Sequence, residues 1–170
     1  MRIMIFRIDG EYGHARLGEK ILSRAAFLSG FCVQSFSVSE RESETGFVKI
    51  DKTPILSKQA EPSDFTLILD ASKMSEIIKS CDESSIVVIN SGKKMKTALM
   101  KKKGIKSYHV DAKAITLDHF KKDIPVIPML GALAKVSNKI SLKNMKTAVE
   151  LEYGKGNAAL EDGYKSVRLG

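Results

Sequence analysis

The chain has 170 residues, a hydrophobic fraction of 43% and a formal net charge of +8. This length supports one well-buried core and is short for two, so we predict a single domain over residues 1–170. The composition excludes a disordered chain, and no apolar run approaches the ~20 residues that a membrane-spanning helix requires. The sequence starts in a strand-like run without a signal-peptide pattern, so we expect a cytoplasmic location.

Cysteine and histidine are too few and too scattered for a self-contained metal centre. The two cysteines, Cys32 and Cys81, form no CxxC pair, and the three histidines form no HxxxH pair. We therefore expect no metal site and no iron–sulfur cluster held by this chain alone. The positive charge predicts an anionic partner: a phosphorylated cofactor, an acidic protein or nucleic acid. The chain offers few side chains on which nucleic-acid bases could stack, because only 6% of the residues are aromatic and tryptophan is absent.

The N-terminal segment predicts a strand, a glycine turn and a helix. Large or branched apolar residues at 3–6 (IMIF) are typical of a strand buried on both faces at the centre of a parallel sheet. Gly10 and Gly13 then interrupt the run, and apolar residues at helical spacing over 17–28 predict a helix closed by Gly30. A Rossmann-like α/β domain begins in this way.

The middle of the chain alternates predicted strands and helices. Strands are expected at residues 31–38, 65–69, 86–89 and 106–110, and helices at 72–80, 94–103 and up to about 120. A charged loop is expected at 39–45, and residues 46–50 and 54–56 flank a polar turn that predicts a β-hairpin. This alternation specifies a three-layer, mostly parallel α/β sheet with a β-hairpin addition.

The C-terminal section is predicted to be helical. Helices are expected at residues 129–135, 142–151 and 157–167. Pro125 and Pro128 bracket the connection into the first of them, and Ser141 is the expected N-cap of the second. The small side chains at 130–134 allow a close backbone approach, which suits either an inter-subunit contact or an ordinary buried helix.

Polar residues follow most of the predicted strands directly. Ligands of an open α/β sheet bind beyond the carboxyl ends of its strands, so these residues mark one expected rim. The rim comprises residues 9–13 together with Glu40, Asp70, Asn90 and Asp111. Capping of the following helices is the alternative role of the last three.

The first turn resembles a dinucleotide-binding loop only in part. Of the G-x-G-x-x-G fingerprint, only the second and third glycines are present, as Gly10 and Gly13. Asp9 and Glu11 would repel a pyrophosphate, although backbone N–H groups at the helix start, with His14 nearby, can bind an anion. We favour a tight turn that packs the helix against the strand.

Lysine is concentrated in one segment, as Lys93, Lys94, Lys96, Lys101, Lys102 and Lys103. A solvated helix face is the default interpretation of such a run, and a docking surface for an acidic protein or nucleic acid is the alternative. No Ser/His/Asp order and no defined carboxylate pair indicates catalysis, so we predict no catalytic residue in this chain.

Short motifs along nearly the whole chain carry a family resemblance. They are AAFLSG at 25–30, FVKID at 47–51, PI at 54–55, LDAS at 69–72, VDA at 110–112, MLGALAK at 129–135, NAA at 157–159 and GY at 163–164. Together they resemble the gamma subunit of the 2-oxoacid:ferredoxin oxidoreductases, and MLGALAK is the most specific of them. The resemblance implies a Rossmann-like subunit that is inactive alone. Its complex converts a 2-oxoacid and coenzyme A to an acyl-CoA and CO2, with electrons passed to ferredoxin.

The resemblance also implies partners, cofactors and a site. Alpha, beta and delta (ferredoxin-like) subunits would accompany the chain and hold thiamine diphosphate and iron–sulfur clusters, while coenzyme A is the co-substrate. The residues implied in coenzyme contact are Gly10, Glu11, Tyr12, Gly13, His14, Glu40, Arg41 and Asp70. Neither a membrane nor nucleic acid is expected as a partner.

Two segments depart from the family pattern, and both lie on the expected rim. The family's GGQG corresponds to GEYG at residues 10–13, and its arginine- and glycine-rich loop corresponds to ERESE at 40–44. A divergent nucleotide-binding or nucleic-acid-binding α/β protein outside the complex is therefore the alternative hypothesis.

Overall fold

The computed structural model describes residues 3–170, so the first two residues of the predicted domain lie outside the described part. The strands are β1 (Met4–Glu11), β2 (Cys32–Glu40), β3 (Ser43–Asp51), β4 (Phe65–Ile68), β5 (Ile86–Asn90), β6 (Lys106–Val110) and β7 (Arg168–Leu169). The α-helices are α1 (His14–Leu28), α2 (Met74–Ile77), α3 (Ala98–Lys103), α4 (Ala112–Phe120), α5 (Val126–Ser137), α6 (Leu142–Tyr153) and α7 (Asn157–Ser166). Short 3₁₀ helices, η1 (Ala71–Lys73) and η2 (Ile78–Ser80), flank α2.

Within residues 3–170 the strands form one seven-stranded sheet in the order β2-β3-β1-β4-β5-β6-β7. β1, β4, β5 and β6 run parallel, whereas β2, β3 and β7 are antiparallel additions at the two edges. β1 is an interior strand, but it borders the antiparallel β3 and is not the predicted centre of the parallel part. Phe6 and Ile8 are fully buried, whereas on the other face Asp9 is buried and Ile5 and Arg7 are partly buried. The predicted burial of both faces is therefore complete on one face and partial on the other.

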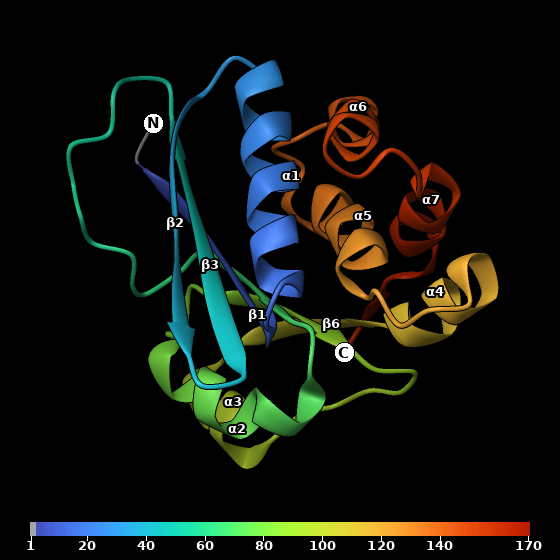
Figure 1. Ribbon diagram of the computed structural model, residues 1–170. Coiled ribbons are helices and arrows are strands. Elements are labelled where there is room, and N and C mark those ends of the chain that lie inside the picture. Colours follow the sequence, from blue (N-terminus) through green and yellow to red (C-terminus); the bar gives the residue numbers. More distant parts are fainter. Residues whose placement is uncertain (1–2) are drawn as a thin grey trace.

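Helices cover both faces of the sheet (Figure 1). α1, α5, α6 and α7 lie on one face, and α2 and α3 lie on the other. Each face has its own buried cluster: Ile8 and Leu22 belong to the first, and Ile89 and Met100 to the second. Two apolar layers on one sheet give the predicted three-layer α/β fold with a helical C-terminal section, which is confirmed.

The sheet contains a β-hairpin, but it is not the predicted hairpin of residues 46–50 and 54–56. β3 pairs with β2 from Cys32↔Asp51 to Glu40↔Ser43, so residues assigned to a charged loop form the ends of two strands. The turn is at residues 41–42, where Arg41 has a φ of 56°. Charged side chains do not prevent pairing here, because residues 38–43 are exposed to solvent and the buried Glu44 carboxylate accepts hydrogen bonds from backbone N–H groups.

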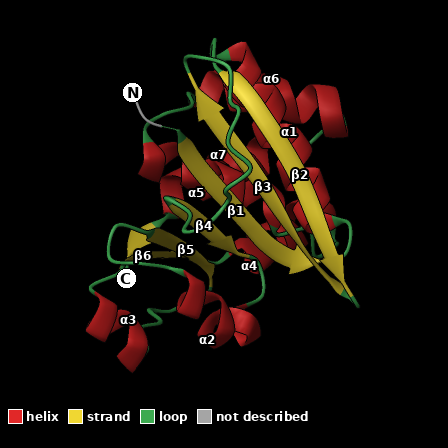
Figure 2. Ribbon diagram, turned by 90° about the vertical axis from the view of Figure 1, so that its left-hand side faces the viewer, coloured by secondary structure: helices red, strands yellow, loops and turns green. Residues whose placement is uncertain are grey.

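Residues 54–56, the expected second strand of that hairpin, belong instead to a long connection. Figure 2 shows this connection crossing the face of β3 and β1 that α1 does not cover. Lys49, fully buried on β3, donates hydrogen bonds from Nζ to the carbonyl oxygens of Ser57 and Gln59. These bonds hold the connection against the sheet in place of a third ladder of strand hydrogen bonds.

Several helix boundaries differ from the prediction because of local capping. Thr97 Oγ1 accepts a hydrogen bond from Met100 N at 3.2 Å, so α3 starts four residues later than expected. α5 starts earlier than expected and contains Pro128 in its first turn. A proline is tolerated there because the N–H groups of a first helical turn have no intrahelical partner, so the missing N–H costs no hydrogen bond. The predicted Ser141 cap is confirmed by a 3.1 Å bond from Asn144 N.

Two glycines let α5 and α7 approach each other closely. A Cβ atom on Gly131 would overlap the carbonyl oxygen of Leu160, and one on Gly163 would overlap the carbonyl oxygen of Pro128. The small-residue stretch of α5 is buried inside this chain. Of the two interpretations of residues 130–134, the buried helix is the one observed.

Candidate functional site

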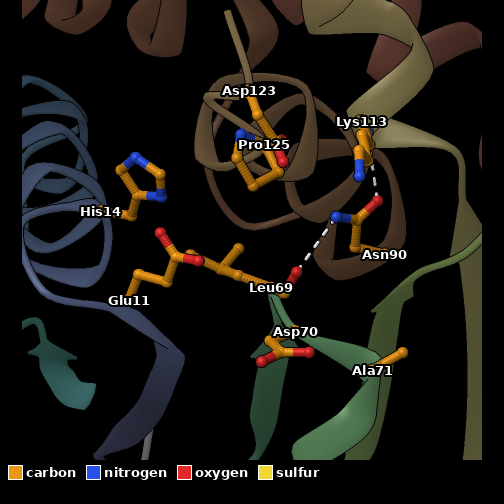
Figure 3. A pocket seen from close by; sticks show the side chains of 9 residues that line it. All are labelled: Glu11, His14, Leu69, Asp70, Ala71, Asn90, Lys113, Asp123 and Pro125. Carbon is orange, nitrogen blue, oxygen red and sulfur yellow. Dashed lines mark hydrogen bonds between the residues drawn. The ribbon is translucent and has the colours of Figure 1, made fainter. Parts of the chain in front are cut away.

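A cavity of about 320 Å³ opens at the carboxyl ends of the parallel strands (Figure 3). Its lining residues are Glu11, His14, Leu69, Asp70, Ala71, Asn90, Lys113, Asp123 and Pro125. They come from the ends of β1, β4 and β5, the starts of α1 and α4, and the connection before α5. The connection after β1 leads to one side of the sheet and that after β4 leads to the other, so the cavity lies where open α/β sheets bind ligands. We call it the rim cavity.

Two of the predicted rim carboxylates cap the helices that follow them. Asp70 Oδ1 accepts hydrogen bonds from the backbone nitrogen and the hydroxyl of Ser72, at 3.0 and 2.7 Å. Asp111 Oδ1 accepts from Ala114 N at 3.0 Å at the start of α4. The capping role is confirmed for both. Only Asp70 also lines the rim cavity.

Asn90 has a bridging role that its position in the sequence did not indicate. Its side-chain nitrogen donates to the carbonyl oxygen of Leu69 at 3.0 Å, and its side-chain oxygen accepts from Lys113 N at 3.2 Å (Figure 3). Asn90 thus contributes to capping α4 and does not cap α3, the next α-helix in sequence. The bridge fixes the end of β4 relative to α4 and so shapes the rim cavity.

The rim cavity carries more acidic than basic groups. Three carboxylates, those of Glu11, Asp70 and Asp123, lie along it with the ammonium of Lys113 and the imidazole of His14. A phosphate placed among these carboxylates would be repelled. The lining therefore fits uncharged amide or hydroxyl groups better than it fits a pyrophosphate.

The N-terminus of α1 already holds an anion from the chain itself. Glu44 on β3 is 2% exposed, and its Oε1 accepts hydrogen bonds from Gly13 N at 2.9 Å and Arg16 N at 2.6 Å. Its Oε2 is buried and has no hydrogen-bond partner among residues 3–170. A phosphate bound by the same N–H groups would first have to displace this carboxylate. In this conformation the first turn is closed to such a phosphate.

The tip of the β2–β3 hairpin lies against the first turn. Tyr12 N donates to the carbonyl oxygen of Glu42 at 3.1 Å, and the Arg16 guanidinium lies 5.7 Å from the centre of the Tyr12 ring. Glu40 and Arg41 are exposed in this tip. The hairpin therefore brings both departures from the family pattern together, beside the rim cavity but outside its lining.

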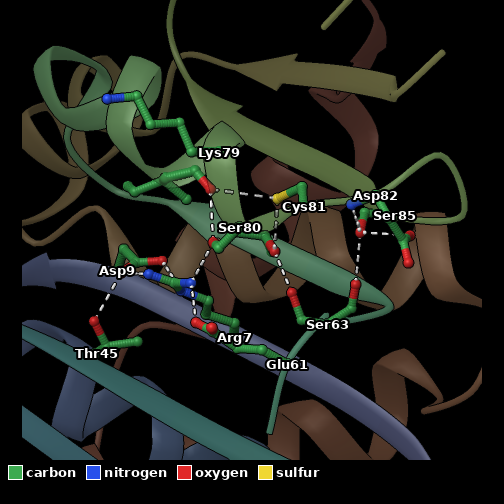
Figure 4. Close-up of polar contacts among 12 residues, drawn as sticks. Arg7, Asp9, Thr45, Glu61, Ser63, Lys79, Ser80, Cys81, Asp82 and Ser85 are labelled. Atoms are coloured by element: carbon green, nitrogen blue, oxygen red, sulfur yellow. Dashed lines mark hydrogen bonds and ion pairs between the residues drawn. The ribbon is translucent and has the colours of Figure 1, made fainter. Parts of the chain in front are cut away.

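Asp9 takes part in a polar network on the face of β1 that carries Arg7 (Figure 4). Asp9 Oδ2 accepts from Arg7 Nε at 2.7 Å, and Asp9 Oδ1 accepts from Thr45 Oγ1 at 2.8 Å. Arg7 Nη1 also donates to Glu61 and Ser80, both at 2.6 Å. The network ties β1 to the long connection and to η2, so Asp9, expected on the rim, has a structural role.

The eight residues implied in coenzyme contact fall into three groups. Glu11, His14 and Asp70 line the rim cavity. Gly10, Tyr12 and Gly13 belong to the end of β1 and the turn after it, and Glu40 and Arg41 to the hairpin tip. Gly10 allows the end of β1 to pack against Leu69, because a Cβ atom at residue 10 would lie 2.6 Å from Leu69 Cδ1.

Lys113, Asp123 and Pro125 also line the rim cavity, and the sequence did not single them out as site residues. Lys113 lies in the first turn of α4, shortly after the end of β6. The rim argument would have included Lys113 if it had counted a few more residues after each predicted strand. Asp123 and Pro125 lie in the connection before α5. No local sequence pattern predicts that this connection reaches the cavity.

No metal centre is seen in the described part of the chain. Residues 3–170 contain no group of three or more His, Cys, Asp or Glu side chains that could hold a metal ion. Both Cys32 and Cys81 are free thiols. No helix in this range is long and apolar enough to cross a bilayer.

The fold and the rim cavity define a Rossmann-like α/β protein with a cavity at the edge of the sheet where open α/β sheets bind ligands. The family described as "Pyruvate ferredoxin/flavodoxin oxidoreductase" matches residues 15–170. The "Pyruvate/ketoisovalerate oxidoreductases common subunit gamma" of Thermococcus litoralis is 33% identical, over 89% of this chain and 90% of that protein. The chain belongs to this family, as a gamma subunit of the 2-oxoacid:ferredoxin oxidoreductases, and is thus part of a multi-subunit oxidoreductase.

Solved structures agree with this assignment. The pyruvate oxidoreductase subunit PORC of Thermotoga maritima matches with a TM-score of 0.84 and 26% identity, covering 99% of both chains. The 2-oxoglutarate:ferredoxin oxidoreductase of Magnetococcus marinus shares the fold, with a TM-score of 0.74 and 17% identity over 97% of this chain and 30% of that chain. The comparisons do not favour the alternative of a nucleotide- or nucleic-acid-binding protein outside the complex.

Proposed function

We propose that the chain works with alpha, beta and delta (ferredoxin-like) subunits in the cytoplasm, as a single domain over residues 1–170. Thiamine diphosphate and the iron–sulfur clusters are held by those companions, coenzyme A is the co-substrate, and ferredoxin takes the electrons. The complex converts a 2-oxoacid and coenzyme A to an acyl-CoA and CO2. The observation that carries this proposal is the similarity to gamma subunits along nearly the whole chain.

Within that complex, the chain contributes the rim cavity to the coenzyme A side of the site. Glu11, His14 and Asp70 meet the uncharged amide arm of coenzyme A, which suits a lining with an excess of carboxylates. The exposed Lys113 is the group available to the anionic part of the coenzyme. Gly10, Tyr12, Gly13, Glu40 and Arg41 shape the same edge of the sheet. The chain's role is to bind and orient the coenzyme, and the chemistry takes place on cofactors held elsewhere.

Charge reversal at Lys113 tests this role. In the assembled complex, Lys113→Glu should raise KM for coenzyme A about tenfold, equivalent to ~1.4 kcal/mol, and leave KM for the 2-oxoacid unchanged. Lys113→Arg keeps the positive charge and should leave KM for coenzyme A as it is in the unmodified complex. Lys139→Glu, on an exposed lysine before α6, is the matched control and should have no effect. Equal KM values for coenzyme A in the Lys113→Glu complex and the unmodified complex would contradict the proposed contact.

A further inference from the structure

One segment of the chain is rich in lysine and contains no acidic residue. Residues 84–110 contain seven lysines and no aspartate or glutamate. Six of these lysines are exposed: Lys93, Lys94, Lys96, Lys101, Lys102 and Lys106. Lys106 shares the opposite face of the sheet with Tyr108, so we call the other five the lysine face. Among residues 3–170 none of the six forms an ion pair. The seventh, Lys103, is the exception to the pattern, since its Nζ is bound to three backbone carbonyls near η2.

One lysine of this face and an arginine on β7 both act on His109. Burial of His109 on β6 lowers the pKa of its imidazole, and the charges of Lys94 and Arg168 lower it further. Lys94 belongs to the loop after β5 and Arg168 to β7. Cations from two separate elements therefore act on His109, so positive charge near β6 is not confined to α3.

The lysine face has no apolar centre. The large exposed hydrophobic residues of the described chain lie elsewhere: Tyr12, Phe27, Leu28, Val38, Leu56, Leu117, Leu151 and Leu169. Permanent subunit interfaces bury an apolar core, whereas transient encounters depend more on long-range charge attraction. The lysine face therefore suits a transient protein partner better than a permanent subunit.

The same residues argue against nucleic acid as that partner. No aromatic residue occurs between positions 84 and 107, so the segment offers no ring for a base to stack on. Tyr108, the nearest ring, lies 5.5 Å from Lys106 Nζ, measured to the ring centroid. A charged surface without stacking groups fits an acidic protein better than a single strand of DNA or RNA.

We propose that the lysine face is the docking surface for an acidic electron-carrier protein, the ferredoxin or flavodoxin that accepts electrons from the assembled complex. This rests on the gamma-subunit role, since the family description names that pair of acceptors. α3, which carries Lys101 and Lys102, lies on one side of the sheet, and α6 lies on the other side (Figure 1). Lysines near α6 therefore serve as controls remote from the docking surface.

Steady-state kinetics of the assembled complex separates docking from chemistry. Lys93→Glu/Lys96→Glu changes two exposed loop lysines, and Lys139→Glu/Lys143→Glu makes the same change of net charge at exposed lysines beside and on α6. We expect the first pair to raise KM for the acidic electron carrier at least tenfold at low salt. Turnover with a small dye acceptor should be unchanged, and raising the salt concentration should shrink the difference. Lys93→Arg/Lys96→Arg should behave like the unmodified complex.

Three results would overturn the proposal. The first is equal KM values for the carrier in the Lys93→Glu/Lys96→Glu complex and the control complex. The second is binding of the lysine face to single-stranded DNA, measured by fluorescence anisotropy, with no effect on the carrier. The third is the absence of dye-linked, 2-oxoacid-dependent turnover in the unmodified complex. It would contradict the proposed function itself, and is distinguished from a docking failure because no lysine has been changed.

Discussion

Replacing Gly131 by alanine is expected to lower the free energy of unfolding by about 3 kcal/mol, the upper end of the usual cost of overpacking. The new Cβ would overlap the carbonyl oxygen of Leu160 and lie 3.0 Å from the backbone nitrogen of Tyr164. Because both are backbone atoms, no side chain can rotate away, and α5 and α7 have to separate. Chemical denaturation followed by circular dichroism measures the change.

Gly154→Ala is the matched control for that experiment. Gly154 has a φ of 83° at the end of α6, and nothing lies within 4 Å of where its Cβ would be. Its replacement costs only the left-handed backbone conformation, about 1 kcal/mol. Equal losses for the two variants would show that α5 and α7 do not pack as described.

Removing the carboxylate of Glu44 is the second large change. Glu44→Ala is expected to cost about 2 kcal/mol of stability, because Gly13 N and Arg16 N lose a buried, charged acceptor at the N-terminus of α1. The vacated N–H groups should then bind inorganic phosphate. Added phosphate is therefore expected to raise the Tm of Glu44→Ala more than that of the unmodified chain.

Glu44→Gln separates the charge from the hydrogen bonds. Its amide oxygen can accept from the same two N–H groups, so this variant should lose less stability than Glu44→Ala and gain no response to phosphate. If phosphate stabilises the unmodified chain as much as Glu44→Ala, the first turn is open to anions and Glu44 does not close it.

The sequence predicted the elements that depend on local pattern and missed those that depend on distant partners. The first strand, the glycine-closed first helix and the Ser141 cap each have a signal within a few residues. The pairing of Ser43–Asp51 with Cys32–Glu40 does not, because a charged hairpin tip looks like a loop until its partner strand is known.

The candidate site shows the same division. The rim argument located Glu11, Asp70 and Asn90, since each ends or follows a strand whose direction in the sheet was predicted. It could not foresee that Glu44, 31 positions after Gly13 in the chain, would cap the first helix. Nor could it foresee that Thr45 on β3 would donate a hydrogen bond to Asp9. Both facts depend on how β1 pairs with β3, which only the folded sheet defines.

The most direct test of the gamma-subunit role is to purify the tagged chain from its native cell and assay it. We expect thiamine- and cluster-containing companion subunits to co-purify, with 2-oxoacid- and coenzyme A-dependent reduction of ferredoxin. The acid that gives the highest kcat/KM would then identify the substrate. Recovery of the chain alone, without companions and without this activity, would contradict the account.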